Sequence, residues 1–158
     1  MANAVATYVE SGSDRKLVVV LGRVDAALDS TFRARGLTVR HPRTRLAAAR
    51  ALTDEARALV LPAHPRIRQD IIELHGHAWD LGAIIVIVLP RDADPNLRAA
   101  MNDVVASALD RRAALNRSEG RIRIESIAAL DEIGELCARH KPGRPPAKER
   151  GFSFDGSV

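Results

Sequence analysis

The chain has 158 residues, of which 46% are hydrophobic and 28% charged, a composition typical of one globular domain with a sizeable core. It has no run near the roughly 20 apolar residues of a membrane span, no secretory signal pattern at its start, and only one cysteine, Cys137, which excludes an internal disulfide and a thiolate metal cluster. The net charge of +4 excludes little by itself, and we expect a cytoplasmic protein.

Arginine outnumbers lysine 21 to 3 and raises the pI to about 10.0. The planar guanidinium suits phosphate recognition. However, an arginine- and alanine-rich chain is also typical of a GC-rich coding sequence, so only local clusters of arginine bear on function.

Residues 1–15 show little periodicity and predict a flexible lead-in. A strand over 17–22 follows, then a helix with Val24, Leu28 and Phe32 on one face and Gly36 as its C-terminal cap. A second strand begins at 37–39 and stops at Pro42. The alanine-rich stretch 46–52 predicts a helix, and 58–61 predicts a short third strand that ends at Pro62.

Pro65 fits the first turn of the next helix, whose inner face carries Ile67, Ile71, Leu74 and Ala78. The apolar, β-branched run 83–89 is a strand that must be covered on both faces, because it does not alternate polar with apolar residues. The pair Asp94-Pro95 predicts the start of a long helix that reaches about Asn116.

The alternating segment 121–125 predicts a half-exposed edge strand. A closing helix follows from Leu130 to about His140, with Cys137 on its buried face. Residues 141–158 are rich in proline, glycine and basic side chains and predict a disordered tail. Five strands alternating with five helices in 16–140 therefore favour one α/β domain, a three-layer, doubly wound fold around a mostly parallel sheet.

Five βα units of this size resemble the flavodoxin-like fold, and within it the receiver domains of bacterial response regulators. Residues 31–39 (TFRARGLTV) resemble the first receiver helix turning into the second strand. The resemblance covers 16–140 and rests on the order of the predicted strands and helices and on the regular spacing of the helices along the chain.

The resemblance implies phosphorylation of an aspartate beside a magnesium ion. In that family an acidic pair follows strand one, the phosphorylated aspartate strand three, a hydroxyl strand four and a lysine strand five. The corresponding positions here are Leu21-Gly22, Pro62-Ala63, Leu89-Pro90 and Glu125-Ser126. We therefore expect a degenerate receiver without a phospho-acceptor, metal or cofactor.

A segment without acidic residues, 31–53, contains six arginines. Three of them, Arg40, Arg43 and Arg45, fall in the loop predicted after strand two, at the sheet edge where such folds bind ligands. Next to a helix N-terminus they are candidates for phosphate binding. The alternative is a solvated basic surface paired with acids elsewhere. A dinucleotide site is disfavoured because Gly22 stands alone where a glycine-rich turn is needed.

The histidines His64, His75 and His77 lie near Asp70, Glu73 and Asp80. Because residues two apart diverge on a helix, we interpret this group as a polar helix face and not as a metal site.

The tail resembles an AT-hook, a Gly-Arg-Pro core with basic flanks that enters the minor groove of A·T-rich DNA. The candidate DNA-binding residues are Lys141, Gly143, Arg144, Pro145 and Lys148. Pro142 stands where an arginine is typical, and a purely solubilising tail is the alternative.

Taken together, the sequence favours a non-enzymatic regulatory module of bacterial signalling type. We expect it to bind a protein partner, to contact DNA weakly through its tail, and to be able to form a homodimer through the helix that starts at Pro95. The competing interpretation is a small phosphate- or nucleotide-binding enzyme that uses Arg40, Arg43 and Arg45.

Overall fold

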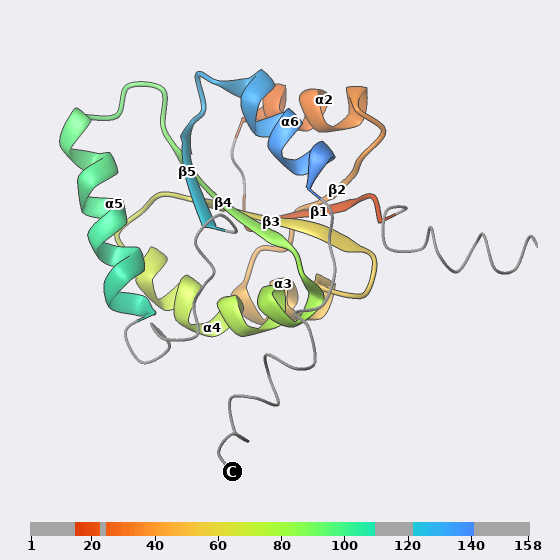
Figure 1. The fold of residues 1–158 in the computed structure, drawn as a ribbon, viewed down its shortest axis with the longest axis horizontal. Helices are drawn as coiled ribbons and strands as arrows, with labels where there is room; N and C mark the ends of the chain where they lie inside the picture. Colours follow the sequence, from red (N-terminus) through yellow and green to blue (C-terminus); the bar gives the residue numbers. More distant parts are fainter. Residues whose placement is uncertain (1–14, 23–24, 110–121, 141–158) are drawn as a thin grey trace, which may run out of the picture.

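The computed structural model describes residues 15–22, 25–109 and 122–140. Strands and helices alternate along these residues (Figure 1). Their bounds are β1 (Leu17–Val20), α2 (Ala26–Ala34), β2 (Thr38–Arg40), α3 (Arg45–Ala51), β3 (Ala56–Pro62), α4 (Ile67–Leu81), β4 (Ile84–Leu89), α5 (Pro95–Ala108), β5 (Ile122–Ser126) and α6 (Leu130–Arg139).

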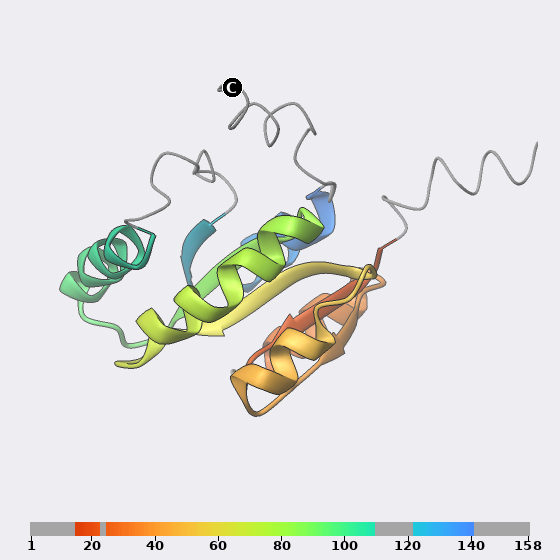
Figure 2. The same cartoon turned by 90° about the horizontal axis from the view of Figure 1, so that it is seen from below.

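The five strands form one sheet in the order β2-β1-β3-β4-β5, and every neighbouring pair is parallel. Helices α2 and α6 cover one face, while α3, α4 and α5 cover the other (Figures 1 and 2). The predicted α/β fold of three layers is therefore confirmed, and it is flavodoxin-like.

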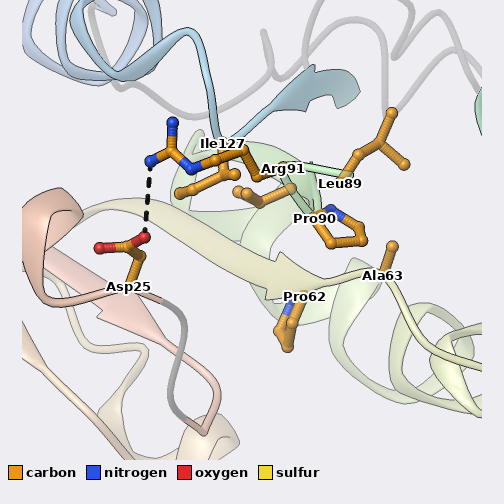
Figure 3. A pocket seen from close by; sticks show the side chains of 8 residues that line it. Asp25, Pro62, Ala63, Leu89, Pro90, Arg91 and Ile127 are labelled. Atoms are coloured by element: carbon orange, nitrogen blue, oxygen red, sulfur yellow. Dashed lines mark ion pairs between the residues drawn. The ribbon is translucent and has the colours of Figure 1, made fainter. Parts of the chain in front are cut away.

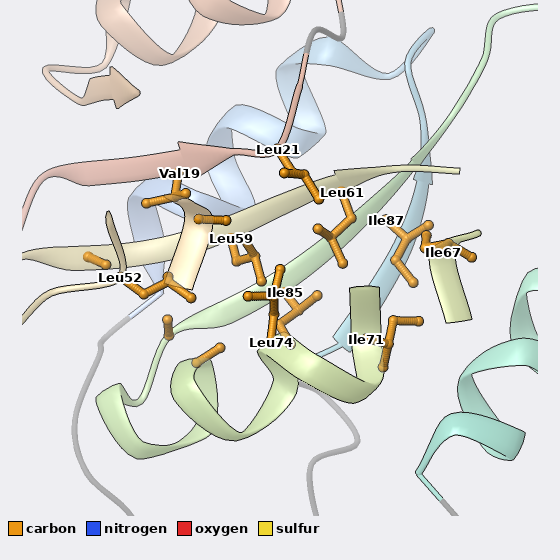
Figure 4. Close-up of a cluster of buried hydrophobic side chains, with 14 of the residues drawn as sticks. Val19, Leu21, Leu52, Leu59, Leu61, Ile67, Ile71, Leu74, Ile85 and Ile87 are labelled. Carbon is orange, nitrogen blue, oxygen red and sulfur yellow. The ribbon is translucent and has the colours of Figure 1, made fainter. Parts of the chain in front are cut away.

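Strand β4 is buried along its whole length because both of its faces are covered. Ile85 and Ile87 pack into the cluster under α3, α4 and α5, together with Leu59 of β3 and Leu74 of α4 (Figure 4). Val86 points to the opposite face, into the cluster under α2 and α6. This explains why the run 83–89 is continuously apolar instead of alternating.

The edge strands are more exposed than the central ones, which the sequence predicts for 121–125. β2 and β5 have partly exposed side chains, whereas every residue of β1 is buried. The α5 start is also confirmed, because the Asp94 side chain accepts a hydrogen bond from the Asn96 amide at 2.7 Å and Pro95 is the first helical residue.

Three predicted boundaries are wrong. Strand β1 ends at Val20 and not at Gly22, whose φ of 75° departs from extended backbone. Helix α5 runs from Pro95 to Ala108, and the predicted continuation toward Asn116 lies outside the described residues. Helix α4 begins at Ile67, two residues after Pro65, because the Arg66 amide donates to Nδ1 of His64 before the helix starts.

The third wrong boundary is the start of strand β3. The strand begins at Ala56 and therefore includes Arg57, a charged residue that lies outside the predicted strand 58–61. Val24, the lead-in up to residue 14 and the tail 141–158 lie outside the described residues.

Cys137 is fully buried between α6 and the sheet, as predicted for this residue. Burial raises the pKa of its thiol from 9.0 to about 12, and the nearby positive charge of Arg57 only partly offsets this effect. The folded state therefore holds the thiol proton more tightly than the unfolded chain does. The stabilisation is complete below pH 9.0 and is lost as the pH rises toward about 12.

We therefore expect the free energy of unfolding to fall more steeply above about pH 9 in the wild type than in Cys137→Ala. Denaturant titrations of both proteins across this pH range measure the difference in their free energies of unfolding. The other titrating groups are the same in both proteins, so their contributions cancel in this difference. Thiol labelling at neutral pH should proceed only through unfolding. Equal slopes for the two proteins, or native labelling as fast as that of the unfolded chain, would contradict the buried placement.

Candidate functional site

The carboxyl ends of the parallel strands meet at one edge of the sheet, where folds of this architecture bind ligands. The first residues after these ends include Gly22 near β1, His41 after β2, Ala63 after β3, Pro90 after β4 and Ile127 after β5. The edge is therefore built mainly from small and apolar residues at the strands, with arginines contributed by the loops.

One hollow of about 390 Å³ lies at this edge, between the ends of β1 and β3 and the starts of α3 and α4. We call it the basic hollow. Its charged and ionisable lining consists of Arg43, Arg45, Arg66, His64 and Asp70.

Arg45 is held in place by acids of α4. Its Nε lies 3.5 Å from Oδ1 of Asp70, and its Nη1 lies 3.2 Å from Oε2 of Glu73. Asp70 is buried, and its Oδ2 lies 2.9 Å from Nε2 of His64. Nδ1 of His64 accepts a hydrogen bond from the Arg66 amide at 3.0 Å. The ring proton is therefore on Nε2, which donates a hydrogen bond to Asp70. Both oxygens of Asp70 are thus occupied.

Arg43 and Arg66 are exposed, and neither forms an ion pair with a described residue. Arg40 lies elsewhere, since it lines a separate open hollow with His41, Pro42, Ala47 and Ala51. The structure therefore brings Arg43 and Arg45 together and adds Arg66, but it does not bring Arg40 into the same hollow.

The loop after β2 is tied to its neighbours by His41. Its Nδ1 lies 3.0 Å from the Gly22 carbonyl and its Nε2 lies 2.7 Å from Oδ2 of Asp29 in α2. Both partners accept hydrogen bonds, an arrangement that the protonated imidazolium satisfies. This bridge fixes the backbone next to the basic hollow.

The N-terminus of α3 is less open than the sequence suggests. The side chain of Thr44 accepts from the Ala47 amide at 3.0 Å, so part of the first turn is already satisfied. The helix also spans only seven residues. Any anion affinity here therefore comes from the arginine side chains.

A second pocket, of about 290 Å³, lies where β3, β4 and β5 end (Figure 3). Its walls are mostly apolar and include Ala63, Pro90 and Ile127. Asp25 is its one carboxylate. Its Oδ1 accepts from the Ala27 amide at 2.8 Å, and its Oδ2 lies 3.8 Å from Nη2 of Arg91.

The polar-face interpretation of α4 is wrong for two residues. Asp70 and His75 are buried, whereas Glu73, His77 and Asp80 are exposed. The ring of His75 stacks on Trp79 with centroids 6.0 Å apart. Within the described part of the chain, no three His, Cys, Asp or Glu residues gather in a way that could hold a metal ion.

Sequence reasoning missed Arg66 and His64 as partners of the loop after β2. They lie beyond the acid-free segment, and only the strand order places the ends of β1 and β3 side by side. A signal was present, because His64 and Arg66 lie within four residues of the end of the predicted third strand.

The DNA-binding candidates Lys141, Gly143, Arg144, Pro145 and Lys148 lie outside the described residues. No helix among the described residues has the length and apolar character to cross a bilayer. Searches with this sequence match no protein-family model and no curated protein.

Proposed function

We propose that the protein is a non-enzymatic regulatory module of receiver-like fold that acts by binding a partner instead of by accepting a phosphoryl group. The observation that carries this proposal is Ala63. It stands at the end of β3, where the resembled family has its phosphorylated aspartate, and a methyl group cannot form an acyl phosphate.

The other strand ends support the same conclusion. Gly22 takes the place of the acidic pair, and Pro90 takes the place of the hydroxyl. Two carboxylates reach this edge: Asp25 caps α2 and faces Arg91, and Asp70 faces Arg45 and His64. Both carboxylates are therefore already bonded to groups of the protein, and Gly22 supplies none in place of the acidic pair.

The basic tail extends the proposal to DNA. Its Gly-Arg-Pro core, flanked by Lys141 and Lys148, suits weak, salt-dependent contact with A·T-rich duplex. DNA is then an accessory electrostatic target, and a protein is the principal partner.

Duplex binding by the full-length chain tests the DNA part of the proposal. Replacing Lys141, Arg144 and Lys148 by glutamine should weaken binding to A·T-rich duplex at low salt. It should also reduce the slope of log affinity against log salt by up to about 2.7, because up to three phosphate contacts are lost. Fluorescence anisotropy between about 50 and 200 mM salt measures both effects.

The matched control removes three positive charges from the domain surface, by glutamine at Arg33, Arg40 and Arg50. If this control weakens binding as much as the tail variant does, the tail has no special role. If the full chain ignores DNA at low salt while a nucleotide raises its melting temperature, the alternative of a nucleotide-binding enzyme replaces the proposal.

A further inference from the structure

We infer that the basic hollow is a binding site for a terminal phosphate or diphosphate group, with Arg43 and Arg66 as its direct ligands. Nothing in the regulatory proposal requires this site, and the tail takes no part in it. The inference rests on which side chains share the hollow and on how their charges are balanced.

The three arginines that line the basic hollow differ in their ion pairing. Arg45 is paired with Asp70 and Glu73, whereas Arg43 and Arg66 form no ion pair with a described residue. These two residues come from different loops and line the same hollow. Two like charges that share a concave surface without a carboxylate of their own suit an external anion.

Asp70 is the one carboxylate in the lining of the basic hollow. Its Oδ1 faces the positive charge of Arg45 and its Oδ2 accepts a hydrogen bond from His64, so both oxygens already have partners. This buried arrangement also fixes Arg45 and the backbone of Arg66. The wall of the hollow is thus organised before a ligand arrives, which lowers the cost of ordering it on binding.

The basic hollow is large enough for a phosphate ligand. The hollow of about 390 Å³ corresponds to about a dozen water molecules at about 30 Å³ each, enough for one or two phosphate groups. Gly22 borders it with a φ of 75° and no side chain, and a Cβ placed there would meet nothing within 4 Å. The planar fork of arginine matches the oxygens of a phosphate in this setting.

The test uses the full-length chain titrated with pyrophosphate and with inorganic phosphate at constant ionic strength, followed by calorimetry. We expect saturable binding at one site. Arg43→Gln and Arg66→Gln should each weaken it about tenfold or more, because each removes a charge-assisted contact. Arg45 is not used as a variant, because its loss would also leave Asp70 without its ion pair.

Arg40→Gln is the matched control, since it removes the same charge from the same surface but lies outside the basic hollow. It should change the affinity less than twofold. Both test residues are exposed, so melting temperatures should stay close to that of the wild type and a loss of fold can be recognised. Binding that does not saturate, or equal weakening by Arg40→Gln, would overturn the inference.

The source of the phosphate is tested by adding A·T-rich duplex to the pyrophosphate complex. We expect no displacement, because a phosphodiester carries one charge per phosphate and has no free terminal group. Displacement by duplex would overturn the assignment to a terminal phosphate. Failure of phosphate binding leaves the regulatory proposal intact, because that proposal rests on Ala63 and is tested through the tail.

Discussion

Truncating Ile87 to alanine is expected to lower the free energy of unfolding by about 2–5 kcal/mol, and truncating its neighbour Val86 by about 2 kcal/mol. The two side chains lie on opposite faces of β4, and both are fully buried. Each truncation leaves a cavity under a different helical layer. A total stability of about 5–15 kcal/mol is typical for one domain, so each loss is a large fraction of it.

Denaturant titration of both variants measures these losses. Arg123 is the matched control, because it lies opposite Val86 in the neighbouring edge strand and is exposed. Its ion pair with Glu125 is at the surface, so Arg123→Ala should cost less than about 1 kcal/mol. If Val86→Ala costs no more than Arg123→Ala, the face under α2 and α6 is not a packed layer and the three-layer description is wrong.

Replacing Arg57 by alanine is expected to lower the free energy of unfolding by about 2–4 kcal/mol. Arg57 is buried near the start of β3. Its Nε donates to the Arg15 carbonyl at 2.7 Å, and its Nη1 donates to the carbonyls of Ala138 and His140 at 2.6 and 3.0 Å. One side chain thus joins β3 to the end of α6 and to the residues before β1.

Two further variants separate the contributions of Arg57. Arg57→Met keeps much of the apolar stem, so its remaining cost reports the lost hydrogen bonds. Arg57→Lys keeps the positive charge but lacks the planar guanidinium, whose several N–H groups reach different carbonyls. It should therefore be more stable than Arg57→Ala but less stable than the wild type. Chemical denaturation measures all three, with exposed Arg50→Ala expected to stay within about 0.5 kcal/mol of wild type. Equal stability of Arg57→Ala and Arg50→Ala would contradict the role assigned to Arg57.

The fold could be predicted because its strongest signals are local. The unbroken run Ile84–Leu89 is typical of a strand covered on both faces, and Asp94-Pro95 marks a helix start by its own hydrogen bonding. Arg57 shows the limit of this reasoning. A charged residue inside a buried strand is stable only because distant carbonyls accept its hydrogen bonds, and no local pattern reveals those partners.

The candidate site was only half predictable for the same reason. The acid-free segment identified Arg43 and Arg45, which do share a hollow, but it also included Arg40, which lines another one. Arg66 joins them because β1 lies between β2 and β3 in the sheet. Asp70 and His75 were assigned to a polar face although both are buried, because helical spacing does not show where a neighbouring loop or ring will pack.

We propose that the carboxyl edge of this flavodoxin-like sheet cannot accept a phosphoryl group. Intact mass measured after incubation with acetyl phosphate and magnesium, beside a functional receiver domain as positive control, tests it most directly. We predict that the chain stays unmodified while the control gains a phosphoryl group. A hydroxylamine-labile phosphoryl group on this chain would contradict the account, because it would reveal a phospho-acceptor carboxylate that Ala63 does not provide.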